Sequence, residues 1–140
     1  MKLYDASKIV RDNGISAARA MTLDVEYKVL TKKSFLESCA AALRNWRRRG
    51  VGKHRGNESL DCNKLAFMVY AELLRFHAIN FSGDAAPAVG LLPYRDDEVG
   101  QHMIVFAVMR NKSLCFYDPT REKQVELSED EKSMALTYVM

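Results

Sequence analysis

The chain has few cysteines and no long hydrophobic segment. Its three cysteines, Cys39, Cys62 and Cys115, cannot all pair with one another, and their spacing matches no zinc-binding pattern. We therefore expect reduced thiols rather than a disulfide framework. No apolar run reaches the roughly 18 residues of a membrane span, and residues 1–5 lack the apolar core of a secretory signal. These absences predict a cytoplasmic protein that is not inserted in a membrane.

Internal repeats, low-complexity segments and linkers are also absent. The 140 residues, of which 48% are hydrophobic and 28% charged, are enough for one domain with a buried core. We expect a single domain over residues 1–140. Within it, we expect an N-terminal helical part (1–56), a core (57–128) and a C-terminal helix (129–140).

The N-terminal part mixes helical and extended patterns. Ser34 is followed three residues later by Glu37, which predicts a capping box, and apolar residues then recur at helical spacing up to Gly50. Cys39 lies on the apolar stripe of this helix, where a free cysteine usually behaves as a small buried hydrophobic residue. Before this helix we expect short helical pieces at 3–11 and 16–23 and an extended segment at 24–30.

A concentration of positive charge coincides with the end of this helix. Residues 44–55 contain no acid and six cations, namely Arg44, Arg47, Arg48, Arg49, Lys53 and Arg55. Such a cluster could bind nucleic acid or an acidic protein. We favour the simpler interpretation, in which cations at the end of a helix complement its dipole. Trp46 is the only aromatic residue in the cluster, which weakens the case for stacking on single-stranded nucleic acid.

The second half of the chain has the pattern of a helix followed by strands. Cys62 opens an apolar-periodic run that predicts a helix as far as His77. Four later segments have the pattern of strands, at 88–92, 103–108, 114–117 and 124–127. We therefore expect an α+β fold, in which a small antiparallel sheet of three to four strands packs against the central helix that carries Cys62.

Two polar signals interrupt and end this series of strands. The run Asp96-Asp97-Glu98 between the first two strand candidates predicts an exposed loop. Ser128, with Glu131 three residues further on, predicts a capping box for a last short helix. We expect this helix to reach about Tyr138.

Cys62 has the position that a thiol nucleophile needs. A thiol attacks as the thiolate, which is stabilised at a helix N-terminus by the backbone N–H groups and the positive end of the helix dipole. The same amides can bind the oxyanion that forms when the thiol adds to a carbonyl. A helix that starts at Cys62 could therefore serve both steps.

The base that activates such a thiol must come within hydrogen-bond reach of the sulfur. His77 lies fifteen residues further along the same predicted helix, about 22 Å away, so it is out of reach. His54 lies in a basic, glycine-containing segment without an evident carboxylate to orient it. His102, which directly precedes the strand candidate at 103–108, is therefore the candidate base.

Asp118 is the candidate for the carboxylate that orients His102. If residues 110–112 form a three-residue hairpin loop, residues of equal parity on the two strands share a sheet face, and His102 and Asp118 become diagonal neighbours. A two-residue loop would point Asp118 away, so the pair depends on this register. In the favoured register Cys115 opposes Ala107 on the other face, which predicts that Cys115 is a core residue.

Three segments of the chain resemble the transglutaminase-like, or papain-like, superfamily of cysteine enzymes. They are Leu60-Asp61-Cys62-Asn63-Lys64, Gly100-Gln101-His102 and Phe116-Tyr117-Asp118-Pro119-Thr120. The Asp61-Cys62 pair is also similar to that of the bacterial transglutaminase-like cysteine peptidases. The resemblance implies that Cys62 is the nucleophile, that His102 is the general base and then acid, and that Asp118 orients His102.

The resemblance also implies an activity. It favours a cysteine hydrolase, a peptidase or amidase that takes an acyl group from a peptide or protein amide to water and needs no metal or cofactor. Transfer to an amine, as in a transglutaminase-like acyltransferase, is a variant of the same chemistry. The alternative is a non-catalytic binding module that uses the 44–55 cluster to bind nucleic acid or an acidic protein partner.

Overall fold

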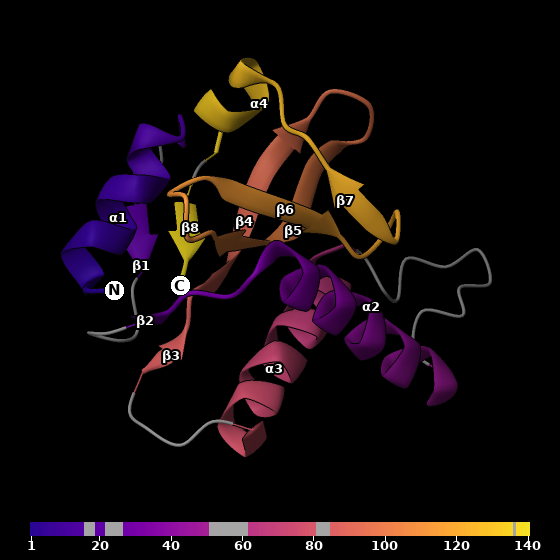
Figure 1. Cartoon of the computed structure of the whole chain (residues 1–140). Coiled ribbons are helices and arrows are strands. Elements are labelled where there is room, and N and C mark those ends of the chain that lie inside the picture. The colour runs from indigo at the N-terminus through magenta and orange to yellow at the C-terminus, as the bar shows by residue number, and fades with distance from the viewer. Residues whose placement is uncertain (16–18, 22–26, 51–61, 81–84, 136) are drawn as a thin grey trace.

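The fold is built around one large sheet with helices on both sides (Figure 1). The computed structural model describes residues 1–15, 19–21, 27–50, 62–80, 85–135 and 137–140. The helices are α1 (Leu3–Asp12), α2 (Lys32–Arg48), α3 (Cys62–Asn80) and α4 (Glu129–Ser133). The strands are β1 (Arg19–Met21), β2 (Tyr27–Lys28), β3 (Ala86–Pro87), β4 (Val89–Asp96), β5 (Gly100–Val108), β6 (Leu114–Asp118), β7 (Lys123–Val125) and β8 (Thr137–Val139).

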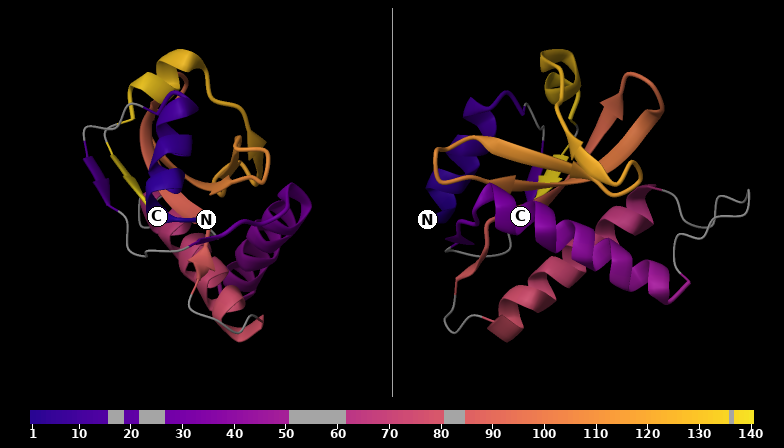
Figure 2. Two further views of the ribbon diagram at one scale, coloured as in Figure 1. Left: turned by 60° about the vertical axis from the view of Figure 1, so that its left-hand side comes forward. Right: turned by 45° about the vertical axis from the view of Figure 1, so that its right-hand side comes forward.

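Six of the described strands form the sheet in the order β1-β8-β4-β5-β6-β7, and β2 and β3 form a separate pair. Neighbouring strands are antiparallel along the series β8-β4-β5-β6-β7. Strand β1 pairs with the other edge of β8 and runs parallel to it. Helices α2 and α3 cross one another beneath the sheet, and α1 lies against its other side (Figure 2). The predicted α+β class, with the helix that carries Cys62 packed on an antiparallel sheet, is confirmed.

The sheet has more than the predicted three to four strands because segments near both ends of the chain contribute to it. Residues 19–21 form β1, so the helix predicted at 16–23 was wrong there; the rest of that segment lies outside the described residues. Helix α4 forms as predicted but ends at Ser133, so its predicted end at about Tyr138 was wrong as well. Strand β8 pairs with β1 and β4 and buries Tyr138 against Phe106, with 6.2 Å between the ring centroids.

The helix ends follow from local capping chemistry. The predicted capping box of Ser128 and Glu131 is confirmed, with both reciprocal hydrogen bonds formed. Helix α2 begins earlier than predicted, because Thr31 rather than Ser34 is its N-cap and accepts a 3.0 Å hydrogen bond from the Ser34 amide. Among the described residues, no helix combines the length and the hydrophobicity needed to cross a membrane.

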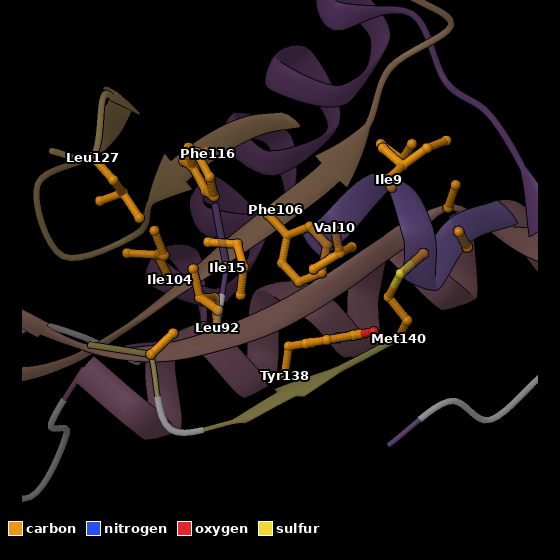
Figure 3. Close-up of a cluster of buried hydrophobic side chains, with 14 of the residues drawn as sticks. Ile9, Val10, Ile15, Leu92, Ile104, Phe106, Phe116, Leu127, Tyr138 and Met140 are labelled. Atoms are coloured by element: carbon orange, nitrogen blue, oxygen red, sulfur yellow. The ribbon is translucent and has the colours of Figure 1, made fainter. Parts of the chain in front are cut away.

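The two faces of the sheet bury separate hydrophobic clusters. Side chains of α2 and α3 pack with Val105 and Ala107 of β5 on one face. Ile104 and Phe106, which alternate with them, point to the other face and pack against α1 (Figure 3). The direction in which a β5 side chain points therefore decides which cluster it joins.

Candidate active site

The β5–β6 hairpin has the register that the sequence predicted. Its loop is closed by a 2.9 Å hydrogen bond from the Met109 amide to the Ser113 carbonyl, and Ala107 stands opposite Cys115. Lys112 adopts a positive φ of 64°, which lets the chain turn within three residues. Side chains of even number on both strands consequently share one face of the sheet.

His102 and Asp118 meet on that face. The Nε2 atom of His102 lies 2.8 Å from Oδ2 of Asp118, and the two residues are 5% and 0% exposed. His102 also packs edge-on against Tyr94, its partner on β4, at 5.8 Å between ring centroids. The Nδ1 atom of His102 makes no hydrogen bond to any described residue, so one ring nitrogen remains available for another partner.

Asp118 has further hydrogen-bond partners besides His102. Its Oδ1 atom accepts hydrogen bonds from the backbone amides of Thr120 (2.9 Å) and Arg121 (3.2 Å), and Nη1 of Arg121 donates to Oδ2 at 2.8 Å. Burial raises the pKa of Asp118, but the hydrogen bonds from His102 and Arg121 lower it more, so this pKa lies below its ordinary value. The carboxylate is therefore both charged and fixed in orientation.

Arg121 is a site residue that the sequence reasoning missed. Its guanidinium bridges Asp118 and Asp96, with Nη1 2.9 Å from Oδ2 and Nη2 3.0 Å from Oδ1 of Asp96. Hydrogen bonds from Arg121, and then from Tyr94, lower the pKa of Asp96 in spite of its burial. A signal was present in the sequence, because Arg121 follows Asp118 by three residues and an acidic run occurs in the preceding hairpin.

Asp96 was predicted to lie in an exposed loop together with Asp97 and Glu98. The structure shows Asp97 and Glu98 exposed, but Asp96 ends β4 and is only 6% exposed. Its buried carboxylate accepts hydrogen bonds from the Tyr94 hydroxyl and the amides of Glu98 and Val99. The prediction was wrong for Asp96, because a solvated turn and a carboxylate that caps a turn have the same sequence pattern.

A cavity of about 360 Å³ opens beside these residues, and its lining includes Tyr94, Asp96, Arg121 and Glu131. Glu131 of α4 reaches into the same region and accepts a 3.1 Å hydrogen bond from the Asp97 amide. Among the described residues, no group of three or more His, Cys, Asp or Glu side chains is arranged to hold a metal ion.

The three cysteines differ in their surroundings. Cys39 and Cys115 are buried, as predicted for core residues, and burial raises the pKa of both thiols. Cys62 is the first residue of α3 and is partly exposed, with its Sγ atom 3.6 Å from Oδ1 of Asn63. Cys62 is therefore the cysteine that a reagent or a substrate can approach.

The structure brings together His102 and Asp118, but it forms no hydrogen bond between Cys62 and His102. Helix α3 packs on the face of the sheet that carries Val105 and Ala107, whereas His102 faces the side of Tyr94. In the described chain, β5 pairs with β6 over residues 105–108, whereas His102 stands opposite Tyr94 of β4 and contacts β6 through the side chain of Asp118. The contact between sulfur and imidazole stays a prediction.

The other predicted features are placed as follows. His77 lies in the last turn of α3, far along the helix from Cys62, and its Nε2 atom is 2.8 Å from the Ala85 carbonyl oxygen. His54, with Lys53 and Arg55 of the basic cluster, lies outside the described residues. Of the remaining cations, Arg47 forms an ion pair of 2.9 Å with Glu122 and Arg49 lies over the Trp46 ring at 5.3 Å.

Comparison with known proteins shows a likeness of fold. No protein-family model and no curated protein sequence matches the chain. A solved structure described as "PSL1a-E64 complex" matches all of the chain with a TM-score of 0.74 at 16% sequence identity. The lectin of Polyporus squamosus, bound to the human-type influenza-binding epitope Neu5Aca2-6Galb1-4GlcNAc, matches 86% of the chain with a TM-score of 0.61 at 19% identity.

The chain corresponds to about half the length of these proteins, 51% of the first and 42% of the second. At this level of identity the likeness shows the fold and not the activity. The fold is papain-like, as the resemblance of the three sequence segments implied.

Proposed function

We propose that this papain-like domain is a thiol-dependent acyl-transfer enzyme, most simply a cysteine peptidase or amidase, with Cys62 as the nucleophile. The observation that carries the proposal is the buried 2.8 Å hydrogen bond between His102 and Asp118. It fixes the ring through one nitrogen and leaves the other able to exchange a proton, which is the arrangement that a general base needs.

The reaction would proceed in two steps. His102 removes the proton from the Cys62 thiol as the sulfur attacks an amide carbonyl, and the N-terminal amides of α3 stabilise the oxyanion. The imidazolium then gives this proton to the leaving amine, and a thioester remains on Cys62. A water molecule, deprotonated by His102, attacks the thioester and releases the acid and the thiol.

Helix α3 and the side chain of His102 lie on different faces of the sheet, so a contact between Cys62 and His102 would have to form at the edge of β5, outside the residues 105–108 that pair with β6. Both residues lie at ends of their elements, Cys62 at the start of α3 and His102 near the start of β5. We propose that the thiol meets Nδ1 of His102 at this edge when a substrate is bound, because catalytic hydrogen bonds often shorten only in the substrate complex.

The similarity to a structure in complex with E64 supports a thiol-based site. E64 is an epoxide that alkylates cysteine thiols, and its peptide-like body agrees with a peptide substrate. It can therefore serve as a probe for this chain.

The test is a labelling experiment with E64 and with iodoacetamide from about pH 5 to 9, followed by peptide mapping. We expect E64 to label Cys62 selectively, with the rate reduced strongly in His102→Ala and less in Asp118→Asn, because Asp118 acts on the thiol only through the base. Cys62→Ser is the control for the site of labelling. If iodoacetamide labels Cys62 at pH 6.5 no faster than it labels Cys39 and Cys115, the catalytic proposal fails.

If the labelling test fails, the non-catalytic binding module becomes the favoured hypothesis. The specific prediction of that alternative is salt-dependent retention of the chain on a polyanion column through the 44–55 cluster. The structure gives two of its cations other partners, since Arg47 pairs with Glu122 and Arg49 lies over Trp46, which leaves Arg44 and Arg48 exposed at the end of α2. This is why we place the alternative second.

A further inference from the structure

A cavity of about 430 Å³ lies beside the loop of the β5–β6 hairpin, at the far end of β5 from His102. Its described lining comes from that loop and from residues 29–32 at the start of α2, and a parallel bridge between Leu30 and Met109 holds the two segments side by side. His102 and Met109 are seven residues apart, about 23 Å in an extended strand. The cavity is therefore separate from the candidate active site.

The floor of this cavity is apolar and its rim is positively charged. Val29, Leu30 and Met109 supply buried or half-buried apolar side chains. Lys32 and Arg110 are exposed at the rim, and the described lining contains no acidic residue. Within the described chain, neither cation forms an ion pair. The two positive charges are consequently not neutralised by a neighbouring carboxylate of the described residues.

The polar side chains of the lining have used acceptors and retain donors. Oδ1 of Asn111 accepts hydrogen bonds from the amide and the hydroxyl of Ser113, which leaves the Nδ2 group of Asn111 to donate. Oγ1 of Thr31, the N-cap of α2, accepts a hydrogen bond from the Ser34 amide, which leaves its hydroxyl proton to donate. A ligand that satisfies these groups must bring acceptors, and a carboxylate brings two oxygens.

The start of α2 gives a second reason to expect an anion. Lys32 and Lys33 occupy the first turn of this helix, which contains no acidic residue. Positive charge is unfavourable there, because the unpaired amides already give this end of a helix a partial positive charge. In the part of the chain that the structure describes, the backbone amides of both lysines also lack an acceptor. A bound carboxylate would offset this repulsion.

We propose that this cavity docks a peptide segment of a protein partner in which an acidic residue stands next to an apolar one. The carboxylate binds between Lys32 and Arg110, and the apolar side chain covers Leu30 and Met109. The volume of about 430 Å³ lies within the range of ligand pockets, about 300–1,000 Å³. A nucleic acid fits less well, because its bases stack on aromatic rings and the described lining contains none.

This docking site is distinct from the 44–55 cluster and does not depend on the proposed function. Lys32 and Arg48 are the two ends of α2, about 24 Å apart at the rise of an α-helix. Docking here therefore leaves the 44–55 cluster available for a different partner.

The experiment measures the binding of a fluorescein-labelled peptide, a short repeat of leucine and glutamate, to the full chain by fluorescence polarisation. We expect saturable binding that weakens between about 50 mM and 200 mM salt, because the contacts at the rim are exposed to solvent. A peptide with glutamine in place of glutamate should bind about tenfold more weakly or worse. A peptide with serine in place of leucine should also lose affinity. Equal binding of the glutamine peptide, or no saturable binding of the leucine–glutamate peptide, would overturn the inference.

The double variant Lys32→Gln with Arg110→Gln tests the rim. Both side chains are exposed, so the variant should fold, and it should bind the leucine–glutamate peptide about tenfold more weakly because two charge-assisted hydrogen bonds are lost. Lys33→Gln is the matched control: it removes the same charge from the next position of the same turn, but Lys33 does not line the cavity. An unchanged affinity in the double variant, or an equal loss in Lys33→Gln, contradicts the proposed site.

NMR spectra of the ¹⁵N-labelled chain locate the bound peptide. The shifts should centre on residues 29–32 and 109–113; shifts centred on residues 44–49 instead would assign the binding to the other end of α2 and sink the proposal. Two competitors test the class of ligand. Oligothymidylate and decanoate, which bring phosphates without an apolar chain and a carboxylate without a peptide backbone, should each displace the peptide only weakly. Displacement by either one at the concentration of the unlabelled peptide would exclude a peptide as the preferred occupant.

Discussion

His102 and Asp118 lie sixteen residues apart in the chain, yet a 2.8 Å hydrogen bond joins them inside the domain. The pair is possible because β5 and β6 turn back on each other through a loop that keeps even-numbered residues on one face. Replacing Asp118 by a residue without a polar side chain would leave Nε2 of His102 buried without this hydrogen bond, which typically costs about 1–3 kcal/mol. The pair therefore contributes to stability as well as to the proposed chemistry.

The first prediction concerns acid unfolding. Asp118 and Asp96 have pKa values below their ordinary ones in the folded chain. Both therefore contribute stability that is fully present above the ordinary carboxyl pKa of about 3.9 and is lost as pH falls through the lowered folded values. We expect the free energy of unfolding in urea to fall steeply below about pH 4. Asp96→Asn should make the free energy of unfolding fall less steeply with pH, whereas replacing the exposed Asp12 by Asn should not. An equal pH dependence in the two variants would contradict the role given to Asp96.

The second prediction concerns the order in which the cysteines react. Cys39 and Cys115 are buried with raised thiol pKa values, whereas Cys62 is partly exposed at a helix start. Iodoacetamide should therefore modify Cys62 first at neutral pH, with a large rate advantage that disappears in denaturant. Mass spectrometry of limited digests measures the order. Early labelling of Cys39 in the folded chain would show that helix α2 is not packed as described.

The third prediction concerns the basic cluster. The ion pair between Arg47 and Glu122 lies at the surface, with side chains 40% and 47% exposed, and such pairs contribute about 0–1 kcal/mol. Replacing Arg47, Arg48 and Arg49 together by alanine should therefore leave the fold and the labelling rate of Cys62 nearly unchanged. A folded triple variant with an unreactive Cys62 would show instead that the cluster belongs to the site.

The fourth prediction concerns Gly90 in β4. A Cβ atom at this position would lie 2.3 Å from the carbonyl oxygen of Val139 and 2.6 Å from the Phe106 ring. Gly90→Ala should therefore separate β8 from β4 and lower the free energy of unfolding by about 3 kcal/mol or more. Gly50→Ala is the control, because Gly50 has a positive φ of 86° but no atom near its missing Cβ. It should cost about 1–2 kcal/mol, and equal effects of the two variants would argue against the close contact.

The parts of the fold that local patterns determine were predictable. The register that pairs His102 with Asp118 follows from strand alternation and a three-residue loop, and both are visible in the sequence. The capping box at Ser128 is likewise a local signal. The N-cap of α2 was misplaced because Thr31 and Ser34 both fit the capping pattern, and only the backbone geometry decides between them.

The features that depend on distant partners were not predictable in the same way. Strands β1 and β8 are three residues each, too short for alternation to be recognised. They exist because β1 pairs with β8 and β8 pairs in turn with β4. The contact between Arg121 and Asp96 joins a turn to the end of β4 across 25 residues, and although the sequence contains both the arginine and the acidic run, it does not place them side by side. A single sequence contains no measure of that proximity.

The position of β8 between β1 and β4 has a consequence for the order of folding. Strands β4 to β7 follow one another in the sequence and pair through short connections, so they can assemble early. The β1–β8 pairing instead closes a loop of more than one hundred residues, from Arg19 to Thr137, which carries a larger entropic cost. We therefore expect the four-stranded meander to form first, and Tyr138 to enter the core in a late, slower step that completes the domain.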